Sequence, residues 1–208
     1  MMMMVLDEEW RKDVVTCALD YANFIWFPCE KNLFHGYDKD GVLVNTPDTT
    51  YSSERFECGW WQVNHANKGL PYNWGGSSNI DAFELGIAEG KFAGNVPDTK
   101  DNGISKYTVG LDCSGLLTIC WKLPKKLSTK ALRSIASPLE STDELLPGDI
   151  LLKPGSHVMI FLNFTDNLNS YAQIVDSTRS IGKVSLRTIS ILEFFGYGYD
   201  GYRMNSTN

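Results

Sequence analysis

The sequence predicts an α+β fold, because a helical pattern occupies its N-terminal part and strand patterns occupy its C-terminal part. Residues 8–27 carry apolar side chains at helical spacing and are followed by Pro28. Residues 146–162 contain two apolar runs around a Pro-Gly turn, as in a β-hairpin. A further strand is expected at 171–176, and a final strand with turns within 195–203. The expected apolar stripe of the helix is Val14, Val15, Ala18, Tyr21, Ala22 and Ile25.

Composition and charge narrow the functional class. The chain has 208 residues, of which 43% are hydrophobic and 21% charged, as is ordinary for one soluble globular domain with elaborations. A net charge of −6 and a pI near 5.1 argue against a nucleic-acid partner. No stretch approaches the ~20 apolar residues of a membrane span, so no membrane partner is expected.

The N-terminal segment has neither the basic region nor the apolar run of a secretory signal. We therefore expect a protein that stays inside the cell, or one that is exported by a non-classical route or after removal of a leader.

The segment Asp112–Gly115 (DCSG) is the strongest chemical signal in the chain. It lies between a polar, glycine-bearing loop and a short apolar run, which predicts that Asp112 caps a helix and Cys113 lies in its first turn. The positive end of the helix dipole and the unpaired N–H groups there favour the thiolate, which is the nucleophilic form of cysteine. The alternative is a buried structural cysteine.

His157 is the expected partner of this thiol. It opens the second strand of the predicted hairpin, where an imidazole can face the start of a helix packed across the strand. The alternative is a hydrogen-bonded structural histidine. The remaining histidines are in less suggestive places, because His35 lies in a Gly/Asp-rich loop and His65 precedes a glycine-bearing turn.

A third group is expected to orient the imidazole. Side chains alternate along 171–176, so Gln173 and Asp176 cannot both face His157 unless a bulge intervenes. Asp176 is the stronger candidate because it is charged and ends the strand. The alternative is that Asp176 only begins a turn.

Four motifs in a specific order resemble those of the NlpC family. They are Tyr72–Gly76 (YNWGG), Asp112–Gly115 (DCSG), Leu146–Asp149 (LPGD) and Ser156–Val158 (SHV). Members of this family are compact papain-like cysteine peptidases and amidases, best known for cutting the stem peptides of peptidoglycan. The resemblance extends from about residue 70 to the C-terminus, and it implies a papain-like domain with N-terminal helices packed on a central antiparallel sheet.

The resemblance also implies roles for individual residues. Cys113 would attack the amide carbonyl, and His157 would act first as general base and then as general acid. The third position in the family is a polar residue on the next strand, commonly His and sometimes Asn, Gln or an acid, and here it is matched by Asp176. Tyr72 matches a tyrosine that lies beside the nucleophile and helps to hold the oxyanion, together with the backbone N–H of Cys113.

Asp112 and Ser114 match residues that contact the free amino terminus of the substrate in members that cut γ-D-glutamyl linkages. Both also have capping roles that would retain them without a substrate. In a related permuted group that includes lipid-directed acyltransferases, the histidine strand precedes the cysteine. Here Cys113 comes first, which favours a peptidase or amidase.

The predicted activity is cysteine-dependent amide hydrolysis through an acyl-enzyme, without a cofactor. The leading substrate is a muropeptide-like peptide from the cell wall. The alternatives are an amidase or deamidase that acts on another peptide or protein, and a catalytically silent peptide-binding module. The sequence leaves the oligomeric state open.

The five cysteines cannot all pair, and none lies in a CxxC motif. The histidines have no familiar zinc spacing relative to them, so no metal site is expected. Cys17 and Cys120 fall within apolar helical patterns and are expected in the core. Whether Cys29 and Cys58 form a disulfide stays open.

We expect one domain over 1–208, with an N-terminal helix and irregular extension at 1–69 and the catalytic core at 70–208. The core contains an insertion at 77–111 that is several times longer than the interval usual in the family. Within it, Ser78 or Asn79 is expected to cap a helix. Because the insertion joins two motifs of the expected site, we expect it over or beside the cleft, as many long loops are.

Overall fold

The fold is α+β, as the sequence predicts. A computed structural model describes residues 8–53, 59–97 and 103–205. Within these ranges the longest helix is α1 (Glu8–Asn23), and the largest sheet has six strands. No described helix is long and apolar enough to span a membrane.

The chain divides into two compact units, and each is described here by itself. Unit 1 comprises Met1–Asp20, Leu117–Asp176 and Leu186–Asn208; unit 2 comprises Tyr21–Leu116 and Ser177–Ser185. The expectation of one domain over 1–208 stays a prediction.

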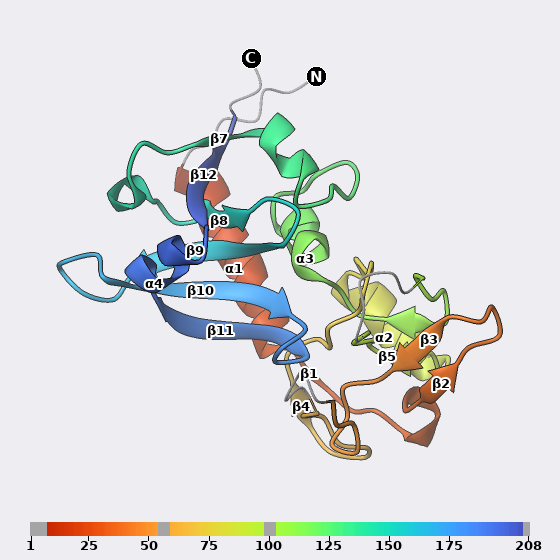
Figure 1. The fold of residues 1–208 in the computed structure, drawn as a ribbon. Coiled ribbons are helices and arrows are strands. Elements are labelled where there is room, and N and C mark those ends of the chain that lie inside the picture. The colour runs from red at the N-terminus through yellow and green to blue at the C-terminus, as the bar shows by residue number, and fades with distance from the viewer. Residues whose placement is uncertain (1–7, 54–58, 98–102, 206–208) are drawn as a thin grey trace. The chain divides into compact units, whose positions relative to one another are not determined.

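The six-stranded sheet has the order β11-β10-β9-β8-β12-β7 (Figure 1). Its pairings β8–β9, β9–β10, β8–β12 and β7–β12 are antiparallel. The predicted hairpin, the strand after it and the final strand are all present. The strands are β7 (Ala136–Pro138), β8 (Ile150–Lys153), β9 (His157–Phe164), β10 (Tyr171–Thr178), β11 (Lys183–Ser190) and β12 (Asp200–Met204).

One face of this sheet in unit 1 is apolar over most of its length. Alternate side chains of neighbouring strands form a buried cluster that includes Leu151, Met159, Phe161 and Ile174. The helix α4 (Ile191–Gly196) contributes to the same cluster, and Figure 1 shows α4 in front of the sheet and α1 behind it. The core on this face of unit 1 therefore forms where period-two strands meet α4.

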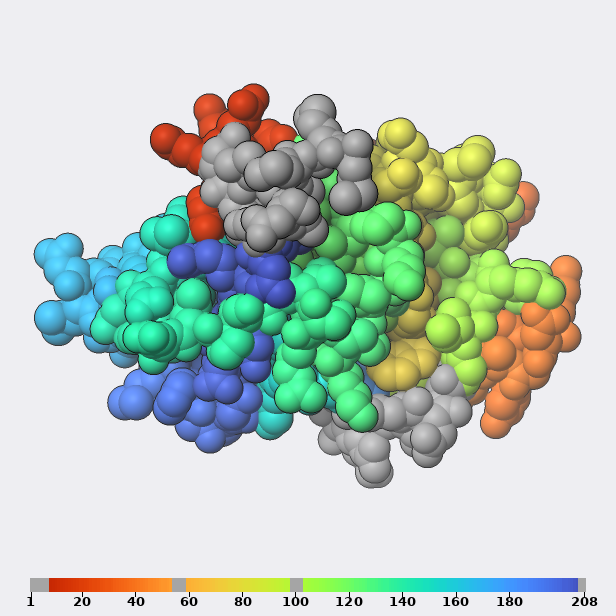
Figure 2. All heavy atoms as spheres, turned by 90° about the horizontal axis from the view of Figure 1, so that it is seen from above, coloured from red at the N-terminus to blue at the C-terminus, as the bar shows by residue number. Residues whose placement is uncertain are grey.

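The connection between β9 and β10 projects from the edge of unit 1 (Figures 1 and 2, light blue). Its turn is held by the Asp166 carboxylate, which accepts hydrogen bonds from the backbone N–H groups of Leu168 at 2.8 Å and Tyr171 at 2.7 Å. Such local bonds satisfy the backbone of an exposed turn and start β10 at a defined residue.

The first helix is shorter than the sequence predicts. α1 ends at Asn23, whereas the apolar pattern predicts a helix to residue 27. The reason is a competing pairing, because β1 (Ile25–Trp26) forms an antiparallel ladder with β4 (Asn67–Lys68). Ile25, expected in the helical stripe, is consequently 49% exposed.

Unit 2 consists of short elements. β2 (His35–Tyr37) pairs with β3 (Leu43–Asn45), and β5 (Phe92–Ala93) pairs with β6 (Thr108–Val109). Single-turn 3₁₀ helices lie at Glu30–Asn32 in this unit and at Ala131–Ser134 and Thr142–Glu144 in unit 1.

The helix predicted within the insertion is present as α2 (Ile80–Ala88). Its cap is Asn79, whose side chain accepts a hydrogen bond from the N–H of Ala82 at 2.8 Å. Gly86 lets this helix lie close to β6, because a Cβ at that position would collide with the side chain of Val109.

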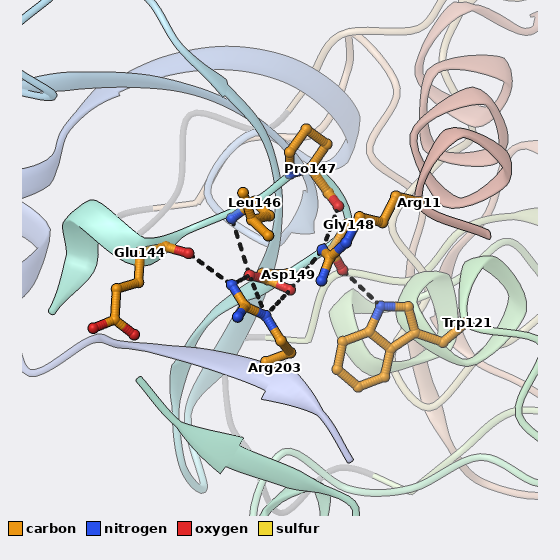
Figure 3. A network of polar contacts seen from close by, with 8 residues as sticks. All are labelled: Arg11, Trp121, Glu144, Leu146, Pro147, Gly148, Asp149 and Arg203. Atoms are coloured by element: carbon orange, nitrogen blue, oxygen red, sulfur yellow. Dashed lines mark hydrogen bonds and ion pairs between the residues drawn. The ribbon is translucent and has the colours of Figure 1, made fainter. Parts of the chain in front are cut away.

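The LPGD motif is built around the buried carboxylate of Asp149 (Figure 3), which is 1% exposed. Its Oδ1 lies 2.9 Å from Nη1 of Arg11, and its Oδ2 lies 2.7 Å from Nη2 of Arg203. The N–H of Leu146 also donates to Oδ2, at 3.0 Å. One carboxylate thus ties α1 and β12 to the turn that starts β8.

The backbone carbonyls of the same turn are also bound by side chains (Figure 3). Arg11 donates to the Pro147 carbonyl at 2.8 Å, and the Trp121 indole N–H donates to the Gly148 carbonyl at 2.9 Å. The turn that precedes β8 is consequently held from several elements of unit 1.

Replacement of Asp149 tests this structural role. Asp149→Ala should lower the free energy of unfolding by about 2–4 kcal/mol, because it leaves two partly buried guanidinium groups without their counter-ion and the N–H of Leu146 without its acceptor. Denaturant unfolding measures the effect. The matched control is Glu84→Ala, which removes an exposed carboxylate from α2 and should change stability by less than about 0.5 kcal/mol. Equal effects of the two substitutions would contradict a structural role for Asp149.

Candidate active site

The helix α3 (Cys113–Cys120) begins at the expected nucleophile. Asp112 caps it, because its Oδ1 accepts the N–H of Gly115 at 2.8 Å and the hydroxyl of Ser114 at 2.9 Å. Its Oδ2 accepts the N–H of Gly75 at 3.1 Å. The predicted cap and the predicted first-turn position of Cys113 are both observed.

Close backbone packing explains the glycines of two motifs. A Cβ at Gly115 would collide with the carbonyl oxygen of Gly76, and a Cβ at Gly76 would meet the carbonyl oxygen of Gly110. Gly75 has a φ of +75°, which favours glycine. The YNWGG and DCSG motifs are therefore in direct contact within unit 2.

Tyr72 lies in electrostatic range of the thiol. Its side chain is 4% exposed, and burial raises the pKa of its phenol well above the ordinary value. The charges of Cys113 and Asp112 raise this pKa further, while Arg179 opposes them. The phenol consequently keeps its proton at neutral pH and is available as a hydrogen-bond donor.

His157 and Asp176 are in direct contact in unit 1. The Nε2 of His157 lies 2.7 Å from Oδ2 of Asp176. The imidazole side chain is 16% exposed, and the carboxylate is fully buried. A buried carboxylate thus contacts a histidine that retains partial access to solvent.

The pKa of Asp176 is lowered by its partners. Burial by itself raises it, but the hydrogen bond and charge of His157, followed by those of Arg187, outweigh burial. The ionised carboxylate can only accept hydrogen bonds, so Nε2 of His157 carries a proton and Nδ1 is the basic nitrogen of the neutral ring. Because the folded-state pKa is lowered, this carboxylate stabilises the fold at neutral pH, and its contribution is lost as pH falls through that pKa.

Arg187 was not identified from the sequence. Its Nε donates to Oδ1 of Asp176 at 3.1 Å, and its Nη2 donates to Oδ2 at 2.6 Å. A single arginine in a strand usually faces solvent. The one sequence feature that points to Arg187 as a partner of Asp176 is its place on the following strand.

A bulge is present between β9 and β10, but it does not bring Gln173 toward His157. The register shifts between Gln173 and Ile174, where β9 contributes the additional residue Leu162. Alternation along β10 is therefore intact, and Asp176 shares its face with Ile174.

The expected site residues are found in two groups. In unit 2 the structure brings together Tyr72, Asp112, Cys113 and Ser114; in unit 1 it brings together His157 and Asp176. The pairing of Cys113 with His157 stays a prediction.

The other cysteines differ in exposure. Cys120 is 1% exposed, and burial raises the pKa of its thiol well above the ordinary value. Cys17 is only partly buried, so the expectation of a core position is wrong for it. A hydrogen bond from Cys120 lowers the pKa of the Cys17 thiol. Cys29 is an exposed free thiol, and Cys58 lies outside the described residues.

The remaining histidines have local partners. His35 Nε2 lies 2.9 Å from Oδ2 of Asp48, and its ring stacks on Tyr51. The Nδ1 of His65 lies 2.9 Å from the Val63 carbonyl oxygen. Among the described residues, no group of three or more His, Cys, Asp or Glu side chains is arranged to hold a metal ion.

Comparisons with known proteins add little to this picture. No family model and no curated protein matches the chain. Among solved structures, the chain is similar to NlpC1 from Trichomonas vaginalis, with 21% identity and a TM-score of 0.32. The match covers 50% of this chain and 37% of that one. A TM-score of this size does not establish a shared fold, so the proposals below rest on the residues.

Asp112 offers a test of the capped helix start. Asp112→Ala should lower the free energy of unfolding by about 1–2 kcal/mol, because the N–H of Gly115 loses its acceptor. Asp112→Asn keeps an acceptor oxygen and should lose less. Denaturant unfolding of both variants measures the difference, and equal losses would show that the acceptor oxygen at this position does not stabilise the helix start.

Proposed function

We propose that the protein is a papain-like cysteine amide hydrolase of the NlpC type, in which Cys113, His157 and Asp176 form the catalytic triad. The observation that carries the proposal is the 2.7 Å contact between His157 and the fully buried carboxylate of Asp176. Burial of a carboxylate costs free energy, because the charge is removed from water. A buried carboxylate in contact with a partly exposed imidazole is the arrangement that orients the general base in catalytic triads. The capped helix start at Cys113 supports the same function.

In the proposed acylation step, Nδ1 of His157 accepts the thiol proton of Cys113, and the sulfur attacks the amide carbonyl carbon. A C–S bond forms while the carbonyl π electrons move to oxygen. The phenol of Tyr72 and the backbone N–H of Cys113 then donate hydrogen bonds to this oxyanion. The raised pKa of Tyr72 suits this role, because only a protonated phenol donates.

The tetrahedral intermediate collapses when the imidazolium of His157 gives its proton to the leaving nitrogen. The C–N bond breaks, the amine departs, and a thioester remains on Cys113. His157 next accepts a proton from water, whose oxygen attacks the thioester carbonyl. The C–S bond breaks, the carboxylic acid is released, and the thiol is restored by the proton on His157. Asp176 stays ionised throughout and holds the ring orientation.

The nucleophile is tested by substitution. Cys113→Ala should lower the hydrolysis of a muropeptide by at least about 10³-fold while leaving the unfolding transition unchanged. Hydrolysis is followed by mass spectrometry of the products. The matched control is Cys29→Ala, which removes an exposed thiol and should leave activity intact. A fully active Cys113→Ala variant would refute the mechanism, and a wild-type thiol that reacts with an electrophilic probe without turnover would indicate a silent binding module.

We propose further that the substrate is a short soluble stem peptide with a free amino terminus. The Ser114 hydroxyl donates a hydrogen bond to Asp112, and a hydroxyl oxygen can also accept one. The Asp112 carboxylate supplies negative charge beside it. A primary ammonium group fits this combination.

The insertion at 77–111 supports a restricted substrate. Its residue Asn95 pairs with the YNWGG motif, because its N–H donates to the Tyr72 carbonyl at 2.9 Å and its carbonyl accepts the N–H of Trp74 at 3.1 Å. A segment that is hydrogen-bonded to the backbone beside Tyr72 reduces the space that a cross-linked wall would need next to this residue. The net charge of −6 also gives no attraction to anionic wall polymers.

Substrate choice provides the next test. Acetylation of the peptide's amino terminus should cost roughly 1–3 kcal/mol in kcat/KM, because the charge partner of Asp112 is lost. Soluble stem peptides should be cleaved faster than intact sacculi. Faster cleavage of sacculi, with no penalty for acetylation, would overturn this specificity while leaving the hydrolase proposal in place.

A further inference from the structure

We propose that Arg187 is a positioning residue that tunes the general base, because it shares the Asp176 carboxylate with His157. This inference rests on the proposed function, since it concerns the same site. Arg187 does not contact the reacting atoms in the mechanism above. It contacts Asp176, and from there its charge also acts on the His157 ring.

The three side chains form a row across neighbouring strands of unit 1. His157 begins β9, Asp176 lies near the end of β10, and Arg187 lies within β11, the next strand of the sheet. The row occupies the face of the apolar cluster, because each of its residues is two positions from a cluster member on the same strand. These members are Met159 on β9, Ile174 on β10 and Ile189 on β11. The sheet therefore holds all three at defined positions.

The contacts show that one oxygen is shared. Oδ2 of Asp176 lies 2.7 Å from Nε2 of His157 and 2.6 Å from Nη2 of Arg187, while Oδ1 accepts Nε of Arg187 at 3.1 Å. The arginine thus binds both carboxylate oxygens in the forked geometry that favours strong charge-assisted bonds. It also restricts rotation of the carboxylate, so the hydrogen bond to His157 has a defined direction.

The sharing has an electrostatic consequence. A lone buried carboxylate would strongly favour the imidazolium form of its histidine, and at neutral pH such a ring is a poor base. Arg187 offsets the charge of Asp176 and adds a positive charge near the ring, and both effects favour the neutral imidazole. Removal of the arginine charge should therefore make His157 bind its proton more tightly and should move the acid limb of the activity profile to higher pH.

Lys153 and Tyr199 also lie near His157 in unit 1. Lys153 lies opposite His157 in the β8–β9 ladder, and its Nζ donates to the Tyr197 carbonyl at 2.7 Å. The Tyr199 ring meets the imidazole edge-to-face at a centroid distance of 6.3 Å. Both remain unchanged when Arg187 is replaced, so they do not account for a difference between the variants below.

A matched pair of substitutions separates charge from shape. Arg187→Gln removes the charge but keeps an amide donor, whereas Arg187→Lys keeps the charge but loses the fork. Both are made in a Cys113→Ala background, and the His157 ring resonances are titrated by NMR. The midpoint of the His157 titration should rise by about one pH unit in Arg187→Gln. In Arg187→Lys it should stay near the midpoint of the Cys113→Ala protein that retains Arg187. Arg133→Met, which removes an exposed arginine from unit 1, should have no effect.

The same substitutions in the active protein give a second measurement. The acid limb of kcat/KM should move to higher pH in Arg187→Gln, and lysine should restore it. Equal midpoints in all variants would overturn the inference, as would equal shifts in Arg187→Gln and Arg187→Lys, which indicate a purely structural role. If Arg187→Gln does not fold, Arg187→Met carries the same expectation. Because the NMR titration needs no turnover, an inactive wild-type protein would refute the proposed hydrolase and leave this test intact.

Discussion

Unit 1 depends on the burial of one carboxylate, that of Asp149. A charge removed from water must be paired and hydrogen-bonded, and Asp149 meets this demand with Arg11 from α1, Arg203 from β12 and a backbone N–H of its own turn. The pairing fixes where β8 starts. Since β8 and β9 pair in a single register, the start of β8 also determines where His157 lies in the sheet.

The same constraint applies at Asp112 and Asp176, and the chemistry differs because the partners differ. Asp112 is satisfied by backbone N–H groups and the Ser114 hydroxyl, so it defines a helix start. Asp149 is bound by guanidinium groups from α1 and β12, so it is architectural. Asp176 has one fixed partner, Arg187, and one that titrates, His157. Of these three buried carboxylates, only Asp176 contacts a side chain that can act as a base, namely His157.

The four motifs that resemble the NlpC family consequently divide by physical role. DCSG and SHV contain the candidate nucleophile and base. LPGD is the ion-paired turn before β8, and the glycines of YNWGG permit backbone contact with DCSG, so both have structural roles that involve no substrate. Tyr72 belongs to both classes, because it is buried and also lies in range of the Cys113 charge.

Local rules are sufficient for what the sequence by itself determined. The helix cap at Ser78 or Asn79, the helix start at Cys113, the hairpin that contains His157 and the face of Asp176 each follow from residues a few positions apart, through capping, turn chemistry and strand alternation. The structure then selects Asn79 as the cap. Tertiary structure decided the rest. α1 ends at Asn23 because β1 pairs with a strand about forty residues away, and Arg11 reaches Asp149 across 138 positions. Arg187 binds Asp176 because β10 and β11 are neighbours. Such partners are selected by the free energy of burying a charge or pairing a backbone, and that free energy exists only once distant segments have been brought together.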